Sequence, residues 1–484
     1  MNKKMNINNP NTPLCVDLDG TLIRSDMLFE ATLLLIRKNP FYIFLLPIWL
    51  LKGKALLKQE IFSKVIINPE ALPYRNEIIE YINIAKKNGK KIVLITASPY
   101  LIAKTIADYI GLFDAVYGSN AEINLKAGNK KDKLIELFGE GKYDYIGDAI
   151  VDLPVWKSAN NAIVVSNNQN LINKVKVVNR QNETINIKKK NVLKVIVKEI
   201  RVYQWVKNIL IFLPVIMAHK IEYQLFIQSL IAFFAFSFTA SSVYVTNDLL
   251  DLESDRLHLR KKKRPIAAGD LSIPFSIILA IGLLFIGFGL TLLMPNYDFL
   301  LVLSLYYIIT TLYSLKLKKV VIVDIITLSI LYTIRIIAGG SATGVEISPW
   351  LLAFSMFLFL SLAIVKRYTE LLLTKGQNKT NISGRGYEVN DIELLISIGP
   401  ASAYISVLVF ALYVNSEQVT KLYNEPMYMW IVAILFLYWI TRIWFLAHRG
   451  QMTDDPIVFT VKDKVSWGIG AIIGLLIVTA SGIL

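Results

Sequence analysis

Three aspartates lie close together at the end of a long apolar segment. Asp248, Asp251 and Asp255 are spaced i, i+3 and i+7, so a continuous helix would place them on one face. Carboxylates this close repel one another unless a cation lies between them. Hard oxygen ligands at this spacing suit Mg²⁺, which often bridges carboxylates to the phosphates of a substrate. A basic run, 256–264, follows at once and offers charge for further phosphate. The pattern predicts a site that ionises a diphosphate at a membrane surface.

A second group of acidic residues lies near the N-terminus. A short apolar run ends in Asp17 and Asp19, within the sequence Asp-Leu-Asp-Gly-Thr. Two further apolar runs lead into Thr96 and into Asp148. Apolar runs separated by helical stretches indicate the strands of a parallel α/β sheet, whose ligands gather at the carboxyl ends of the strands. We therefore expect these polar side chains to meet at one edge of the sheet.

This set of motifs resembles the haloacid dehalogenase-like phosphatases. The resemblance implies that Asp17 is a nucleophile that forms an aspartyl-phosphate and that Asp19 is the general acid/base. A lysine would neutralise the phosphate, and the Lys-rich stretch leaves open which one. A catalytically inactive, regulatory version is the alternative. The implied catalytic residues are Asp17, Asp19, Thr96, Lys130 or Lys131, Asp148 and Asp152, and the implied Mg²⁺ ligands are Asp17, Asp19 and Asp148.

The interval between Asp17 and Thr96 is long for a strand–helix–strand crossover and predicts an apolar helical cap at 25–75. Within it, residues 41–51 are entirely apolar, with a central proline and lysines on both sides. This run is too short to span a bilayer and favours a helix or hairpin at the membrane interface. An ordinary cap core is the alternative. On the membrane interpretation, the cap holds the phosphatase where a lipid-linked phosphate could enter it.

The composition determines the elements that must position these groups. The chain has 484 residues, of which 54% are hydrophobic and 18% charged, which is too apolar for an ordinary soluble protein. We predict a multidomain chain, an α/β Rossmann-like domain followed by an all-α polytopic membrane domain. The expected segments are a disordered tail at 1–12, the α/β domain at 13–170, a linker at 171–200 and the membrane domain at 201–484. The expected spans are 205–219, 225–247, 272–294, 298–315, 320–340, 349–366, 393–415, 427–447 and 465–484.

Charge predicts the orientation in the membrane. Loops 248–271, 316–319, 366–392 and 448–464 hold most of the lysine and arginine of the membrane domain. By the positive-inside rule these loops and the N-terminal domain are cytoplasmic. The net charge of +15 is then a topology signal and a contact with anionic lipids rather than a nucleic-acid site. The single cysteine, Cys15, excludes an intramolecular disulfide.

Residues 201–484 resemble the UbiA superfamily of intramembrane prenyltransferases. The resemblance is carried by the motif Asn247-Asp248-X-X-Asp251-X-X-X-Asp255 and by the nine-helix plan. Members usually carry a second Asp-rich motif, but the corresponding region here holds only Asp324. This departure counts against an aromatic prenyltransferase, in which two acidic clusters share the metals of an isoprenyl diphosphate.

A closer likeness is to the decaprenyl-phosphate phosphoribosyltransferase branch. Its signature pieces lie here at 201–208, 255–265, 313–318, 366–370 and 448–456, the third by a near match, and the usual proline after His258 is a leucine. The likeness implies transfer of 5-phosphoribose from phosphoribosyl pyrophosphate to polyprenyl phosphate, with Mg²⁺ held by the three aspartates. The candidate substrate-binding residues are Lys207, Asn247, Arg256, Lys261, Arg264, Lys316, Asp324, Arg335, Lys366 and Arg367.

Some of these residues have structural alternatives. For the basic residues of the loops, the alternative is a positive-inside anchor. Asp324 and Arg335 are eleven residues apart, which is three helical turns, so we expect them on one side of a helix that lines the active cavity. Arg442 is a third ionisable group within a span, and it is open to a structural pairing with an acid on another helix.

The pairing of the two halves suggests two successive reactions. The membrane half would make polyprenyl-phosphoryl-5-phosphoribose, and the phosphatase half would remove its 5-phosphate. One rival is an aromatic prenyltransferase with a fused phosphatase, and the other is a scaffold or transporter. The expected partners are the two substrates and membrane lipids, and homo-oligomerisation is left open.

Overall fold

The computed structural model divides into two compact units. One unit contains Met1–Ile200 and Val245–Leu279, and the other contains Arg201–Tyr244 and Ala280–Leu484. Most of the expected tail at 1–12 lies outside the described residues. The structure describes residues 11–120, 123–187, 190–220, 222–378, 380–382, 384–417, 419, 423–452 and 455–482.

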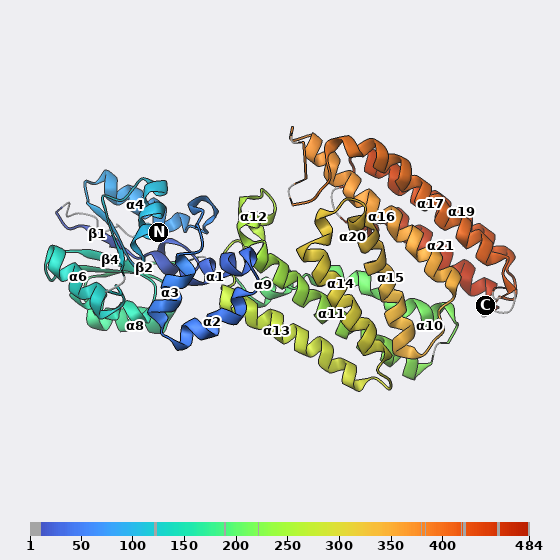
Figure 1. The fold of residues 1–484 in the computed structure, drawn as a ribbon, viewed down its shortest axis with the longest axis horizontal. Helices are drawn as coiled ribbons and strands as arrows, with labels where there is room; N and C mark the ends of the chain where they lie inside the picture. The colour runs from blue at the N-terminus through green and yellow to red at the C-terminus, as the bar shows by residue number, and fades with distance from the viewer. Residues whose placement is uncertain are drawn as a thin grey trace. The chain divides into compact units, whose positions relative to one another are not determined.

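The first unit contains a six-stranded sheet in the order β3-β2-β1-β4-β5-β6, in which every pair is parallel (Figure 1). This arrangement confirms the α/β expectation. The strands are β1 (Leu14–Val16), β2 (Ile92–Pro99), β3 (Ala115–Ser119), β4 (Asp144–Gly147), β5 (Asn161–Val165) and β6 (Asn182–Ile185).

Both faces of this sheet are buried under helices. Leu14 and Val16 of β1 belong to one apolar cluster, and Cys15 between them belongs to another, as the two-residue period of a strand requires. The first cluster includes residues of α1 (Met27–Lys38), α4 (Asn76–Lys87) and α5 (Tyr100–Ile110). The second includes residues of α6 (Gly128–Phe138), α7 (Leu153–Ser158) and α8 (Gln169–Val178).

Two segments of this unit can be compared with expectation. The expected cap region contains α1, α2 (Tyr42–Leu51) and α3 (Lys54–Phe62), in agreement with a helical cap. The segment 171–200 was expected as a linker, yet β6 within it pairs with β5 and extends the sheet, and α9 (Val192–Glu199) follows. The short strand β6 was not predicted, because the segment is rich in Asn and Lys. The residues of β6 are only half-buried and therefore form no apolar run.

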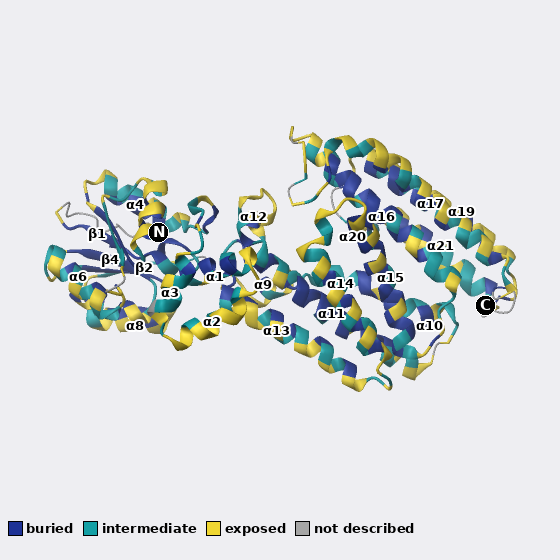
Figure 2. Cartoon of the chain, in the orientation of Figure 1, coloured by how far each residue is buried: buried dark blue, intermediate teal, exposed yellow. Residues whose placement is uncertain are grey.

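The second unit is helical. It contains a 3-10 segment at Val202–Phe212 and all or part of α10 (Leu213–Met217), α11 (Tyr223–Leu250), α13 (Ile273–Leu290), α14 (Asp298–Leu315), α15 (Val323–Thr343), α16 (Pro349–Lys375), α17 (Ile392–Val414), α19 (Met427–His448), α20 (Pro456–Lys462) and α21 (Lys464–Ala480). Figure 2 shows many exposed residues along α13, and these include Phe285, which is 75% exposed. Apolar exposure of this extent is what a lipid-facing helix requires.

The number of spans agrees in part with the expected nine. Within the described residues, seven helices are long and apolar enough to cross a membrane, and two bent pairs would raise the number to nine. The bent pairs are Val192–Glu199 with Val202–Met217, at 50°, and Pro456–Lys462 with Lys464–Ala480, at 83°. Both bends precede the expected spans: 205–219 falls on the 3-10 segment and α10, and 465–484 falls on α21.

Candidate functional site

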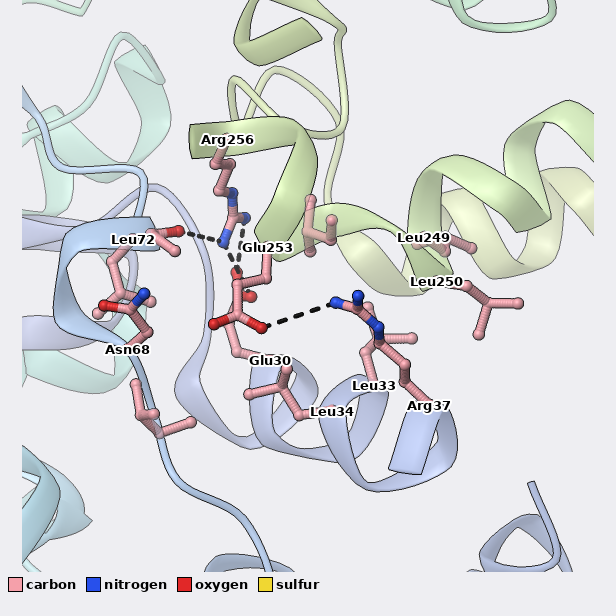
Figure 3. A pocket seen from close by; sticks show the side chains of 13 residues that line it. Glu30, Leu33, Leu34, Arg37, Asn68, Leu72, Leu249, Leu250, Glu253 and Arg256 are labelled. Carbon is pink, nitrogen blue, oxygen red and sulfur yellow. Dashed lines mark hydrogen bonds and ion pairs between the residues drawn. The ribbon is translucent and has the colours of Figure 1, made fainter. Parts of the chain in front are cut away.

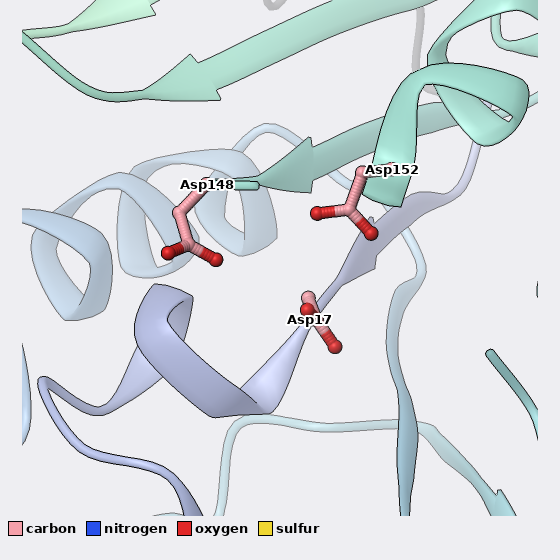
Figure 4. A group of neighbouring side chains, drawn as sticks. All are labelled: Asp17, Asp148 and Asp152. Carbon is pink, nitrogen blue, oxygen red and sulfur yellow. The ribbon is translucent and has the colours of Figure 1, made fainter. Parts of the chain in front are cut away.

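Three carboxylates meet at the carboxyl edge of the sheet. Asp17 directly follows β1, Asp148 directly follows β4, and Asp152 ends the short 3-10 turn Ile150–Asp152 (Figure 4). Because β1 and β4 are parallel neighbours, their ends lie side by side. One ligand oxygen from each residue lies within 4.8 Å of the other two. An all-oxygen set of this kind fits a hard divalent cation such as Mg²⁺.

A buried lysine neutralises part of this charge. Lys130 Nζ lies 2.7 Å from Asp17 Oδ1 and donates to the Tyr145 hydroxyl at 2.9 Å, and that hydroxyl donates to Asp152. Lys131 instead pairs with Asp132 at 3.0 Å, and its side chain is 36% exposed. Of the two lysines that the sequence left open, Lys130 is the one at the carboxylates.

Asp19 lies beside this group and is held by a separate set of donors. Its carboxylate accepts hydrogen bonds from the Met27 amide at 2.8 Å, the Ser98 hydroxyl at 2.9 Å and the Thr96 hydroxyl at 3.3 Å. Among the described residues, the three-carboxylate group includes Asp152 where the sequence analysis expected Asp19. Ser98 was not singled out, although its position two residues after Thr96 on the same strand was a usable signal.

The turn after Asp19 requires glycine. Gly20 has φ +74°, and a Cβ at this position would overlap the carboxylate of Asp148. The next residue, Thr21, donates a hydrogen bond to Asp148 at 3.0 Å. The Asp-Gly-Thr sequence thus lets the backbone pass close to the acid delivered by β4.

Burial raises the pKa values of these acids. Desolvation raises the pKa of Asp17 to about 8, although Lys130 opposes the shift. Desolvation likewise raises the pKa of Asp19 and of Asp148 to about 6 each. Charged carboxylates are therefore costly here without further positive charge, which is the condition that favours a cation or a metal-bound phosphate.

The Asp-rich segment departs from the expected continuous helix. Helix α11 ends at Leu250 and α12 (Leu252–Leu257) begins after Asp251, so the three aspartates do not lie on one helix. Asp248 and Asp255 are buried, and a single guanidinium nitrogen of Arg264 contacts both, at 2.9 Å from Asp248. Within the described residues these aspartates do not form a three-carboxylate group, and their role as metal ligands stays a prediction.

The neighbouring basic residues have defined contacts in the first unit. Arg256 makes a two-pronged ion pair with Glu30 of α1, at 2.7 and 3.0 Å (Figure 3). It also donates to the carbonyls of Ala71 and Ala267. This arginine was expected to bind substrate phosphate, and the structure shows its guanidinium engaged by protein groups instead. Lys261 is half-exposed, 3.9 Å from Asp255.

The second unit brings together two lysines that the sequence analysis selected. Lys207 and Lys366 lie 2.7 and 3.0 Å from the same carboxylate oxygen of Asp455, and the Tyr332 hydroxyl donates to that carboxylate. Asp455 had been noticed within a motif but given no role. Its neighbour Asp454 lies outside the described residues. Two converging ammonium groups form a cationic cluster that suits phosphate.

A second polar cluster surrounds Asp324. The guanidinium of Arg367 pairs with this carboxylate, Arg385 lies 3.1 Å from it, and the Tyr313 hydroxyl donates to it at 2.7 Å. Asp324 is thus fully compensated by protein groups. Arg385 was not selected from sequence, because nothing in its loop marked it.

The remaining candidates are scattered. Arg335 is buried like Asp324 on α15 and donates to Asn208 at 2.8 Å, and the expectation that this side lines a cavity stays a prediction. Lys316 is exposed, and Asn247 is half-buried near the end of α11. Arg442 pairs with Asp463 at 2.6 Å, which is the structural alternative foreseen for it.

Comparison with known proteins identifies the family to which the helical region is similar. Residues 209–462 match the UbiA prenyltransferase family. The chain is 37% identical over 471 residues to an uncharacterized protein of Sinorhizobium fredii, which covers 97% of this chain and 91% of that protein. It is 32% identical over 266 residues to the nodulation protein NoeC of Azorhizobium caulinodans, covering 55% of this chain and 86% of that one.

A further relative carries a named enzymatic activity. Over 188 residues the chain is 36% identical to the decaprenyl-phosphate phosphoribosyltransferase of Corynebacterium glutamicum, covering 38% of this chain and 57% of that protein. The family match spans most of the helical region and agrees with its series of apolar helices. The chain belongs to the UbiA prenyltransferase family and is a multi-pass membrane protein.

Proposed function

We propose that this chain is a bifunctional membrane enzyme. Its helical half transfers 5-phosphoribose from phosphoribosyl pyrophosphate to polyprenyl phosphate, and its α/β half removes the 5-phosphate to leave polyprenyl-phosphoryl-ribose. The observation that carries the first activity is the 36% identity to decaprenyl-phosphate phosphoribosyltransferase. The observation that supports the second is the group of Asp17, Asp148 and Asp152 with Lys130.

In the transferase reaction, a phosphate oxygen of the lipid forms a bond to C1 of ribose. The bond from C1 to pyrophosphate breaks, and pyrophosphate leaves with its electron pair. Lys207 and Lys366 would hold phosphate oxygens, which would take the place of the Asp455 carboxylate on which the two ammonium groups now converge. The aspartates 248, 251 and 255 have the oxygen chemistry for Mg²⁺, which would offset the charge of the leaving group. In the structure these carboxylates are engaged by protein, since Arg264 pairs with both Asp248 and Asp255.

In the phosphatase reaction, a carboxylate oxygen of Asp17 attacks phosphorus and the bond to the ribose 5-oxygen breaks. Asp19, which lies beside Asp17 and is held by the Met27 amide and the Ser98 hydroxyl, donates a proton to that oxygen. Water then attacks the aspartyl-phosphate and releases inorganic phosphate. Lys130 stabilises the charge on the transferred group, and the hydroxyls of Thr96 and Ser98 position Asp19. Mg²⁺ held by Asp17, Asp148 and Asp152 would supply further positive charge.

The cellular setting follows from these assignments. We place the α/β domain on the cytoplasmic side of a bacterial inner membrane. This domain comprises the predicted residues 13–170 together with β6. Its substrate would then form at the inner leaflet, on the side that the basic loops favour. The product would be a lipid-linked pentose for the cell envelope.

The decisive experiment supplies both substrates to purified protein in proteoliposomes with Mg²⁺. Mass spectrometry of the extracted lipid should show polyprenyl-phosphoryl-ribose for the wild type and the 5-phosphorylated lipid for Asp17→Asn. Identical products from the two proteins would refute the sequential scheme. Attachment of a radiolabelled isoprenyl chain to 4-hydroxybenzoate would instead favour the aromatic prenyltransferase alternative.

A further inference from the structure

Helix α2 presents an apolar face that the α/β domain does not cover. It has no charged side chain, and none of its residues is buried. Tyr42, Leu46 and Trp49, at i, i+4 and i+7, pack against the apolar core of the domain. The opposite face is exposed. Its exposed fractions are 74% for Phe41, 71% for Phe44, 48% for Ile48 and 88% for Leu51.

The surroundings of this face indicate what covers it. Soluble surfaces rarely expose so many large apolar side chains next to one another. Lys38, Lys52 and Lys54 flank the helix and are exposed, so the apolar face has a cationic border. This combination is typical of a helix that lies in the headgroup region of a leaflet with anionic lipids. Within the described residues the same chain has seven apolar helices of spanning length, so the domain is covalently tethered to a membrane-spanning segment.

Helix α3 connects the apolar helix to the phosphatase site. The two helices are joined at Gly53, whose φ of +123° makes the tight turn. Lys58 of α3 donates to the carbonyl of Ala97 at 3.1 Å. Ala97 lies between Thr96 and Ser98, whose hydroxyls hold Asp19. A half-buried ammonium therefore lies one residue away from the groups that position the general acid.

We propose that α2 and α3 form an arm through which the phosphatase site takes its substrate from the bilayer. The apolar face of α2 lies among the lipid headgroups, and Lys58 binds the phosphodiester charge of a lipid-linked phosphomonoester. This inference rests on the proposed phosphatase function and adds its substrate class. Such a lipid carries two anionic groups separated by a sugar, a terminal phosphate for Asp17 and an inner phosphodiester for Lys58. A soluble sugar phosphate has only the first.

The first test measures the position of α2 in the full chain. The sole cysteine, Cys15, is buried, so a new surface cysteine can be labelled selectively. We introduce Phe44→Cys, and Lys87→Cys on α4 as a solvent-exposed control, and label each with an environment-sensitive fluorophore in proteoliposomes containing phosphatidylglycerol. Lipids that carry a quenching spin label near the headgroup should quench the fluorophore at position 44 and leave the fluorophore at position 87 unquenched. Equal quenching at the two positions overturns the proposal.

The second test compares lipid-linked with soluble substrate. Wild type, Phe44→Glu and Lys58→Gln are assayed for phosphate release from synthetic polyprenyl-phosphoryl-5-phosphoribose in vesicles and from ribose 5-phosphate in solution. Lys58→Gln should lower the ratio of kcat/KM for the lipid-linked substrate to kcat/KM for ribose 5-phosphate by about tenfold, the size expected for one charge-assisted contact. Phe44→Glu should lower the same ratio, because it replaces an apolar contact with the lipid by a charge. Val177→Glu, which replaces an 85% exposed apolar residue of α8, is the matched control and should keep the wild-type ratio.

The outcomes separate the two proposals. If the wild type releases phosphate from neither substrate, the phosphatase function is wrong. If it hydrolyses both and the two arm variants keep the wild-type ratio, the phosphatase function stands and the lipid arm is refuted. If position 44 is shielded from the lipid quencher by the protein's own helices, the arm is a packing element and the proposal also fails.

Discussion

The two carboxylate groups of this chain are built in opposite ways. Asp17 and Asp148 follow two neighbouring parallel strands, and their counter-charge is the fully buried Lys130. Asp248 and Asp255 lie on either side of a break between α11 and α12, and their counter-charge is Arg264, whose side chain is 30% exposed. A sheet edge fixes side chains in place, whereas a loop-borne cation can leave when a ligand arrives. The first group is thus organised in advance, and the second is arranged so that a substrate could displace its counter-charge.

The largest expected effect is the loss of phosphatase activity when its proposed nucleophile, Asp17, is replaced. Asp17→Asn should reduce phosphate release to the background rate, because the amide cannot form the covalent intermediate. Transfer of phosphoribose to lipid should continue, since the change removes no group from the other site. Mass spectrometry of the lipid products measures both activities in one sample. Loss of transfer in this variant would mean that the two groups do not act separately.

The reciprocal change tests the loop-borne group. A double variant, Asp248→Ala with Asp251→Ala, should abolish ribose transfer and keep phosphatase activity on ribose 5-phosphate. Removing two carboxylates leaves Arg264 paired with Asp255 alone and removes two of the three aspartates that could offer oxygen ligands to Mg²⁺. Transfer at the wild-type rate would show that this group has no part in the reaction.

A smaller effect distinguishes the two adjacent lysines. Lys130→Met should destabilise the α/β domain by about 3–5 kcal/mol in metal-free buffer, because it leaves the buried Asp17 without its partner. Lys131→Met should change the free energy of unfolding by no more than about 0.5 kcal/mol, since that side chain is partly exposed. Hydrogen exchange of the β1 and β4 amides at increasing denaturant concentration can compare the two. Equal effects would contradict the assignment of Lys130.

The smallest expected effect concerns the support of the Asp-rich loop. Glu30→Gln should lower the free energy of unfolding of the first unit by about 1–3 kcal/mol, because the side chain of Arg256 loses one charge-assisted partner. Glu253→Gln is the control, since its pair with Arg37 is longer, at 3.6 Å, and more exposed. Hydrogen exchange of α12 should quicken in the first variant only. Unchanged exchange in both would show that Glu30 does not hold the loop.

Much of the first group was predictable from sequence. Short apolar runs ending in acids predict strands whose polar ends converge, and this reasoning brought Asp17 and Asp148 together with Asp152. The choice between Lys130 and Lys131 was beyond reach, because adjacent residues on a helix differ by only 100° in direction. Asp19 was expected among the ligands, yet hydrogen bonds from Met27 and Ser98 hold it to one side.

Less of the helical half was predictable. Periodicity identified the apolar helices, but it treated 248–255 as continuous and could not show the break at Asp251. Long-range ion pairs were also hidden, such as Lys207 with Asp455, which are 248 positions apart. Hydropathy measures length and apolar content, and it carries no information on which distant charges will pair.

The contact between Arg256 and Glu30 has a consequence for how this chain can be divided. Residues Val245–Leu279 fold as part of the N-terminal unit although they lie within the family-matched region. A gene divided at residue 200 would therefore express an N-terminal fragment that lacks Val245–Leu279. The C-terminal fragment would lack Glu30, the partner of Arg256. When the two fragments are mixed, the native structure of the first unit requires that the ion pair between Arg256 and Glu30 form between them.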